Sequence, residues 1–151
     1  MLVNRHAGQA RPVAAAVFSA MIDTTLSSRS LKTRADRDPI LSRETVQMAV
    51  QFYLGVGDPS DPRVNALSGD FSGLPPIRID VGDEEVLLDD ALQFHEHAER
   101  SGQACDVHVW KGMMHVFPAS VATLEAATEA LNDVASFLRQ ELGRTAAPLP
   151  V

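Results

Sequence analysis

The hydrophobic positions of the chain predict that its first regular element is a buried strand. An uninterrupted apolar run, Val13–Phe18, follows Pro12 and ends at Ser19. A run without alternation is typical of a strand that is buried on both faces of a parallel sheet. A buried turn of helix is the competing interpretation because alanine favours helix, but Pro12 and the short length of the run favour the strand.

Two later segments alternate between apolar and polar positions, which predicts two more strands. In 77–81 the odd positions are isoleucine or valine, and the positions between them are charged. In 106–110 two valines alternate with Asp, His and Trp. A period of two places the apolar side chains on one face of each strand and the other side chains on the opposite face.

Helical spacing of apolar residues predicts three helices. The first begins after Ser42, which suits an N-cap, and ends at Gly55. The second covers 88–101. The third is a long amphipathic helix whose apolar stripe runs over 121–138 and which ends near Gly143. We expect this stripe to be a core face.

The remaining segments predict little regular structure. Residues 22–39 are polar and form a long excursion, and 57–62 is a loop by its Gly, Asp and Pro content. A short helix is expected over 1–6 and a frayed tail over 146–151. The sequence therefore predicts one domain over 1–145.

The order of these elements predicts an α/β fold with about three parallel strands and flanking helices. Catalytic and binding residues in such sheets lie in the loops at the carboxyl ends of the strands. Glu85 follows the strand at 77–81, and His115 follows the strand that ends at Trp110. Adjacent parallel strands lie about 4.8 Å apart, so these two loops can touch.

Glu85 and His115 are the residue types that complete an acid–His–nucleophile relay. In such a relay the imidazole accepts a hydroxyl proton and the carboxylate holds the imidazole in the correct tautomer. Four apolar residues flank His115, and we expect them to form a wall that excludes water and could hold an acyl chain: Met113, Met114, Val116 and Phe117.

Composition limits the alternatives. The chain has 151 residues, of which 45% are hydrophobic and 22% charged, as in ordinary globular domains. A net charge of −7 argues against binding to nucleic acid. The single cysteine, Cys105, cannot form an internal disulfide, and no signal sequence or membrane span is visible, so a cytoplasmic protein is expected.

Other candidate groups predict no further site. His95 and His97 are two positions apart on a helix, so they do not share a face and are not expected to bind metal. Cys105 begins a strand and is expected to be a buried, inert thiol. His108 receives no role.

Two motifs resemble one known family. Glu85-Val-Leu-Leu-Asp-Asp90 after the second strand, and Trp110-Lys-Gly-Met-Met-His115 after the third, resemble the C-terminal part of the bacterial hormone-sensitive-lipase-like esterases, which are α/β-hydrolases. The resemblance runs from the strand at Val13 to the last helix. It implies a carboxylesterase lineage that acts on small-molecule esters without a metal or organic cofactor.

The same resemblance implies roles for individual residues. His115 is the general base and Glu85 the acid, with Asp83 as the reserve for the acid. Asp89 is expected to cap the helix that follows.

The sequence departs from the family at the nucleophile. Its Gly-x-Ser-x-Gly and His-Gly-Gly motifs do not occur in the 151 residues, and Gly69–Gly73 has the wrong spacing. We therefore expect a partial, truncated α/β-hydrolase domain that lacks the N-terminal strands, the oxyanion motif and the nucleophile elbow, and is inactive alone. The alternative is a non-catalytic remnant or interaction module that pairs with another hydrolase half. An exposed edge of the first strand would favour such association, or a homo-oligomer.

Overall fold

The computed structural model describes residues 11–146. The helix expected over 1–6, and the tail from residue 147 on, lie outside the described residues, so the division into domain and tail stays a prediction. The elements follow in this order, where η denotes a 3₁₀ helix: β1 (Ala15–Phe18), α2 (Ser30–Thr33), α3 (Arg43–Leu54), η1 (Ala66–Ser68), β2 (Ile77–Gly82), α4 (Leu88–Arg100), β3 (Cys105–Trp110), η2 (Phe117–Ser120) and α5 (Glu125–Ala146).

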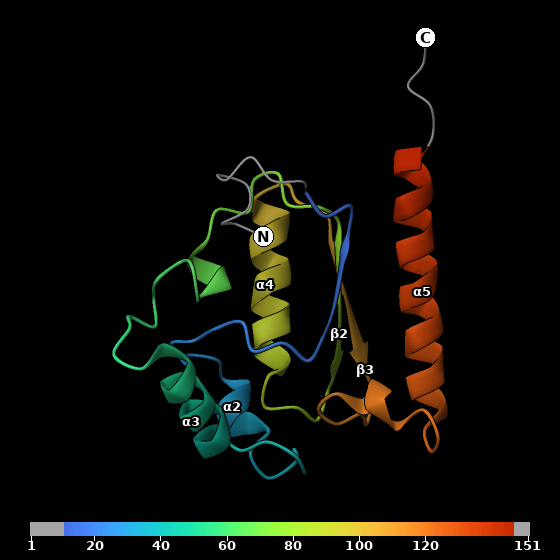
Figure 1. The fold of residues 1–151 in the computed structure, drawn as a ribbon. Helices are drawn as coiled ribbons and strands as arrows, with labels where there is room; N and C mark the ends of the chain where they lie inside the picture. The colour runs from blue at the N-terminus through green and yellow to red at the C-terminus, as the bar shows by residue number, and fades with distance from the viewer. Residues whose placement is uncertain (1–10, 147–151) are drawn as a thin grey trace.

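The three strands form one parallel sheet in the order β1-β2-β3, which confirms the predicted α/β fold. Ile77 in the central strand lies opposite Ala15 on one side and Cys105 on the other. Figure 1 shows α4 on one side of the sheet and α5 on the other. α4 is the crossover helix between the parallel strands β2 and β3, whereas α5 follows β3, and the two helices cover opposite faces of the sheet (Figure 1).

The core lies mainly between the sheet and α4. One face of the central strand packs against α4 through a cluster of buried apolar side chains: Ile22, Phe71, Ile77, Ile79, Val81, Leu88, Ala91, Phe94, Ala98 and Cys105. A second cluster packs α5 against the segment that follows β3, through Phe117, Ala127 and Ala130. These two clusters fix the carboxyl ends of β2 and β3 relative to each other.

The opposite face of β2 is buried as well, although its alternation predicted a polar face. Arg78 is 6% exposed and Asp80 0% exposed. The Arg78 Nε lies 2.8 Å from an Asp80 carboxylate oxygen, and the Trp110 indole N–H donates to the other oxygen at 2.8 Å. Asp133 on α5 lies 3.5 Å from the Arg78 guanidinium. The charges are buried because they are paired there.

Most of the predicted first and last residues of the helices are confirmed. The Ser42 hydroxyl accepts the Thr45 N–H at 3.2 Å, so Ser42 is the N-cap of α3 as expected. Gly55 ends this helix with a φ of 58°. Residues 22–39 were expected to have little regular structure, and they contain only the four-residue helix α2.

The last helix differs from its prediction. It begins at Glu125, so Val121 lies before it and is 49% exposed. Leu131 is 39% exposed, whereas Ala127 and Val134 are buried. The stripe is therefore only partly a core face: Val134 is buried, whereas Val121 and Leu131 are exposed, and the alanines Ala127 and Ala130 pack against Phe117. The helix also continues through residue 143, which was expected to end it.

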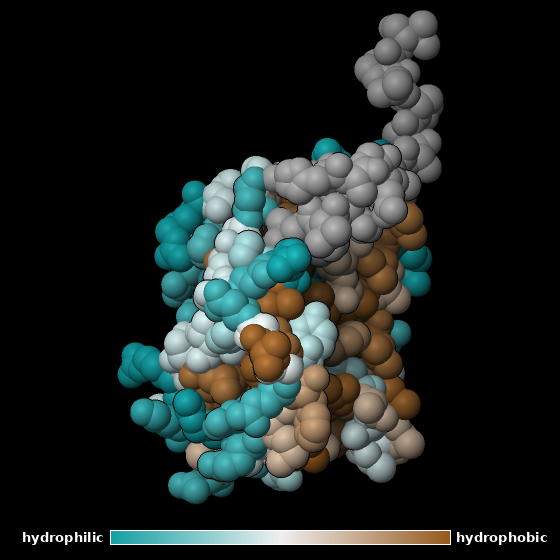
Figure 2. All heavy atoms as spheres, turned by 60° about the vertical axis from the view of Figure 1, so that its left-hand side comes forward, coloured by the Kyte–Doolittle hydropathy of each residue, from teal (hydrophilic) through white to brown (hydrophobic). Residues whose placement is uncertain are grey.

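The surface shows hydrophilic and hydrophobic side chains side by side. Figure 2 shows hydrophobic residues reaching the surface between hydrophilic ones. Exposed apolar side chains on or next to α3 include Met48, Phe52, Tyr53 and Val56. Among residues 11–146, no helix is long and apolar enough to cross a bilayer.

Candidate active site

The structure brings Glu85 and His115 into contact at the carboxyl-terminal edge of the sheet. Glu85 lies in the turn between β2 and α4, and His115 lies in the loop after β3. The His115 Nδ1 is 3.1 Å from the Glu85 Oε2. Glu85 is fully buried, whereas 20% of the His115 side chain is exposed. The pair therefore has a buried acid and an imidazole that solvent or a reactant can reach.

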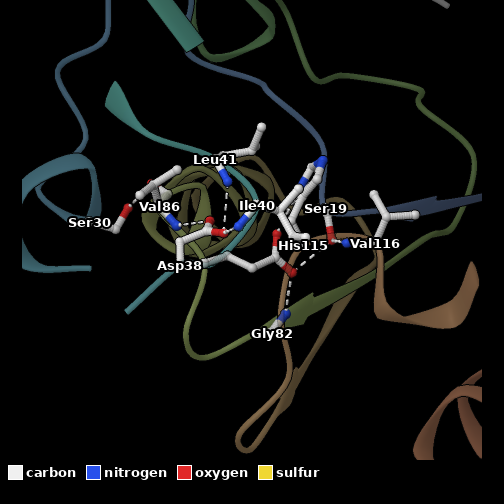
Figure 3. A network of polar contacts seen from close by, with 10 residues as sticks. Ser19, Ser30, Asp38, Ile40, Leu41, Gly82, Val86, His115 and Val116 are labelled. Atoms are coloured by element: carbon white, nitrogen blue, oxygen red, sulfur yellow. Dashed lines mark hydrogen bonds and ion pairs between the residues drawn. The ribbon is translucent and has the colours of Figure 1, made fainter. Parts of the chain in front are cut away.

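The hydrogen bonds around Glu85 determine which imidazole nitrogen carries the proton. The Glu85 Oε1 accepts the Ser19 hydroxyl at 2.7 Å and the Gly82 N–H at 2.6 Å. A carboxylate accepts hydrogen bonds and donates none. Its bond to the His115 Nδ1 therefore needs the proton on Nδ1, which leaves Nε2 of the neutral ring free to accept one. Figure 3 shows Ser19, Gly82, His115 and Val116 gathered around this network.

The loops after β2 and β3 are also joined through their backbones. The Asp83 N–H donates to the Trp110 carbonyl at 3.0 Å. The Met113 carbonyl approaches Gly82 so closely that a Cβ at this glycine would lie 2.0 Å from the oxygen. The absence of a side chain at Gly82 thus permits the loop that carries His115 to lie against the loop that carries Glu85.

The neighbouring acids have other partners. The Asp83 carboxylate, the reserve for the acid, accepts the Gly112 N–H at 2.6 Å rather than contacting His115. Glu84 forms an exposed ion pair with Arg37. Asp89 lies in the first turn of α4, as expected for an acidic residue at the positive end of the helix, but it is not the cap, because the N-cap is Leu87 and has no side-chain bond.

Asp89 instead joins α4 to α2. Its carboxylate accepts the Ser30 N–H at 2.9 Å, and the Ser30 hydroxyl accepts the Asp89 N–H at 3.0 Å. The predicted cap failed because a carboxylate in the first turn of a helix can reach another segment instead of its own backbone.

The apolar wall expected around His115 is only partly present. Phe117 is 0% exposed and belongs to the core cluster with α5, with its ring centroid 5.4 Å from that of Trp110. Val116 is 38% exposed. Met113 and Met114 are partly buried against the same cluster. Phe117 therefore holds the loop in place and does not line a pocket.

Sequence reasoning missed two residues of this network. Ser19 directly follows β1, so the rule that drew attention to strand ends could have found it. Asp38 accepts the Val86 N–H at 2.9 Å through one oxygen and the N–H groups of Ile40 and Leu41 through the other (Figure 3). Asp38 thereby fixes the backbone directly after Glu85.

A second buried network holds the segment after β1 against α4. The Asp90 Oδ2 accepts the N–H groups of Ile22 and Asp23 at 2.8 and 2.9 Å, and the Ser28 hydroxyl donates to Oδ1. Burial raises the pKa of Asp90 above its ordinary value. This network contacts neither Glu85 nor His115 directly, and its role is to anchor the chain between β1 and α2.

The pKa of Asp23 is shifted in the opposite direction, below its ordinary value. Burial alone would raise the pKa of Asp23, but hydrogen bonds from Ser27 and Thr25 outweigh it and lower this pKa. The Asn65 amide also donates to Asp23 at 3.1 Å. The two pKa values are thus shifted oppositely, because burial dominates at Asp90 whereas the hydrogen bonds from Ser27 and Thr25 together outweigh burial at Asp23.

Other candidate groups have structural partners. Cys105 is buried, and burial raises the pKa of its thiol to about 11, as expected for an inert cysteine. The His95 Nδ1 lies 2.8 Å from the Cys105 carbonyl, and the His97 ring stacks on Phe71 at 4.6 Å. Within residues 11–146, no group of three His, Cys, Asp or Glu side chains is placed to hold a metal ion.

Comparison with known proteins points to one family. The family model described as alpha/beta hydrolase fold matches residues 1–119. A protein named "Esterase" from Acinetobacter venetianus is 38% identical over 122 residues, which are 80% of this chain and 40% of that protein. An "Acetyl-hydrolase" from Streptomyces hygroscopicus is 33% identical over 139 residues, 92% of this chain and 46% of that protein.

Solved structures show the same likeness. An esterase from the bacterial hormone-sensitive lipase family superposes with a TM-score of 0.90 at 33% identity. The match covers 93% of this chain and 47% of that one. The expected resemblance to these esterases is confirmed. The chain spans less than half the length of these relatives.

Proposed function

Because the chain belongs to the α/β-hydrolase fold family, we propose that Glu85 and His115 are the acid and the general base of a serine carboxylesterase. The observation that carries this proposal is the contact between a fully buried carboxylate and the Nδ1 of a partly exposed imidazole. The names of the relatives, an esterase and an acetyl-hydrolase, support an ester as the substrate class.

The reaction assigns a separate task to each nitrogen of His115. Nε2 accepts the proton of a serine hydroxyl as the serine oxygen attacks the ester carbonyl, and then gives that proton to the leaving alcohol. Water, deprotonated by the same nitrogen, releases the acid and restores the serine. Glu85 keeps the proton on Nδ1 and stabilises the imidazolium that forms. This scheme needs a serine on a strand-to-helix turn, and Gly-x-Ser-x-Gly does not occur in these 151 residues.

A nitrophenyl-ester assay tests the proposal on the chain itself. We expect no measurable hydrolysis from the chain, because without a serine nucleophile the pair cannot form the acyl intermediate. Turnover that the substitution His115→Ala abolishes would instead reveal a nucleophile within these residues. Turnover that survives His115→Ala would contradict the role of His115.

A second candidate function is that of a module that pairs with another hydrolase half. β1 pairs with β2 alone among the described strands, so its other edge has no strand beside it in residues 11–146. Such an edge offers backbone N–H and C=O groups to a partner strand. Size-exclusion chromatography tests whether this edge associates with a second copy of the chain: a concentration-dependent oligomer supports association through the edge, and a monomer at all concentrations contradicts such self-association.

A further inference from the structure

The hydroxyl of Ser19 touches both halves of the candidate relay. It donates to the Glu85 Oε1 at 2.7 Å, and it accepts the N–H of Val116, the residue after His115, at 3.0 Å. A serine hydroxyl has one hydrogen to donate and can also accept, so both capacities are used here. One side chain from the end of β1 thus connects the acid after β2 with the loop after β3 (Figure 3).

The conformation of Ser19 is held in a region that serine rarely occupies. Its φ is 48° and it is 4% exposed. Its own N–H donates to the Asp80 carbonyl at 3.0 Å, which continues the pairing of β1 with β2. Val116 is also left-handed, with a φ of 50°. The two residues joined by the hydrogen bond from the Val116 N–H to the Ser19 hydroxyl therefore both have strained backbone angles, which the surrounding fold maintains.

We propose that Ser19 is the positioning residue of the Glu85–His115 pair. Its hydroxyl fixes the carboxylate so that Oε2 faces Nδ1, and it fixes the backbone after His115 so that the ring stays against that oxygen. Gly82 donates to the same Oε1 at 2.6 Å, so the carboxylate is held from two strands. The catalytic meaning of this role rests on the function proposed above, but the positioning itself does not.

The alternative role for Ser19 is to supply an unusual backbone angle alone. The substitution Ser19→Gly separates the two roles, because glycine adopts positive φ without penalty but has no hydroxyl. If only the backbone angle matters, the variant keeps the pair intact. If the hydroxyl matters, the pair loosens although the backbone is relieved.

Two nuclear magnetic resonance readouts on the whole chain test this. The first is the exchange rate of the Val116 amide, measured against the Ile79 amide in β2 as a reference for opening of the whole fold. The second is the signal of the His115 Nδ1 proton. In Ser19→Gly we expect the Val116 amide to exchange roughly tenfold faster relative to Ile79. We expect the Nδ1 proton signal to disappear through exchange with water.

The control variant is Ser28→Ala. It removes another buried serine hydroxyl that donates to a carboxylate, but its partner is Asp90. We expect both readouts to be unchanged in this control. The proposal would be overturned if Ser19→Gly kept the original exchange rate of the Val116 amide relative to Ile79, or kept the His115 Nδ1 proton signal. Equal acceleration of exchange at Val116 and Ile79 would also overturn it. Ester hydrolysis does not enter these readouts, so failure of the proposed function would be seen separately.

Discussion

The carbonyl of Met113 lies directly over Gly82, in the space that a side chain would fill. A Cβ built on Gly82 would lie 2.0 Å from the Met113 oxygen and 3.1 Å from the Glu85 Oε1. Real side chains never approach a carbonyl oxygen so closely. The close approach is therefore what allows the loop with His115 to reach Glu85.

We predict that Gly82→Ala separates these loops. The backbone of one loop has to move, because the obstacle is a main-chain carbonyl and not a flexible side chain. Urea unfolding should show a loss of stability of several kcal/mol, in the range of severe single substitutions. The matched control is Gly143→Ala, since a Cβ there meets nothing within 4 Å. The prediction fails if the two variants are equally stable.

We predict that Glu85→Gln exchanges the tautomer of His115. The glutamine oxygen can still accept from Ser19 and Gly82, which places the amide NH₂ against Nδ1. An NH₂ group donates, so Nδ1 has to become the acceptor and the proton moves to Nε2. Nitrogen-15 spectra of the ring report the tautomer directly. A neutral ring that remains protonated on Nδ1 in this variant would contradict the hydrogen-bond assignment.

We predict that Asp90→Asn changes how stability depends on pH. Burial raises the pKa of Asp90 in the native state above the value of 3.8 expected for the unfolded chain. The native state therefore holds this proton more tightly than the unfolded state. The stabilisation is complete below about pH 3.8 and is lost as pH rises through the native pKa.

The asparagine variant should not show this loss. Its oxygen can accept the N–H groups of Ile22 and Asp23, and its amide can face the Ser28 hydroxyl. The stability of the variant relative to the native chain should therefore increase as pH rises above about 3.8, measured by urea unfolding at each pH. Asp23, whose pKa is lowered, contributes the opposite slope to both proteins. A difference that is independent of pH would contradict the prediction.

We predict that Phe117→Ala destabilises the fold by about 3–5 kcal/mol, as expected for a large aromatic side chain removed from a core. Phe117 is 0% exposed and packs with Ala127 and Ala130 of α5. Phe52→Ala is the control, because Phe52 is 83% exposed and its removal should change stability by less than about 0.5 kcal/mol. Thermal unfolding compares the two, and similar losses would show that the cluster does not hold α5.

Local patterns were sufficient to predict the strands and most helix ends. The apolar run before Ser19 and the cap at Ser42 depend on neighbouring residues only, so they can be seen in the sequence. The contact between Glu85 and His115 was also expected, because adjacent parallel strands place their following loops at one edge.

Features that depend on distant partners could not be predicted from local patterns. Arg78 and Asp80 looked like a solvent-facing side of β2, but they pair with each other and lie beneath α5, some 50 positions later. The helix α2 has only four residues, and its Ser30 is held by Asp89 of α4. The place of Ser19 at the end of β1 can be seen in the sequence, but its hydrogen bond to Val116 joins it to a loop almost a hundred positions away and cannot.

The proposed role of His115 is that of the general base of an ester hydrolase. A chimera tests it most directly, in which this chain replaces the matching segment of the Acinetobacter venetianus esterase, so that the remainder of that relative completes the hydrolase. The kcat for a nitrophenyl ester is measured for the unsubstituted chimera, for the chimera with His115→Ala, and for the chimera with His108→Ala, which is a histidine control on β3. We predict an active chimera whose kcat falls at least about 100-fold with His115→Ala and is unchanged by His108→Ala. A folded chimera that is inactive, or whose activity is the same after His115→Ala, would contradict the claim.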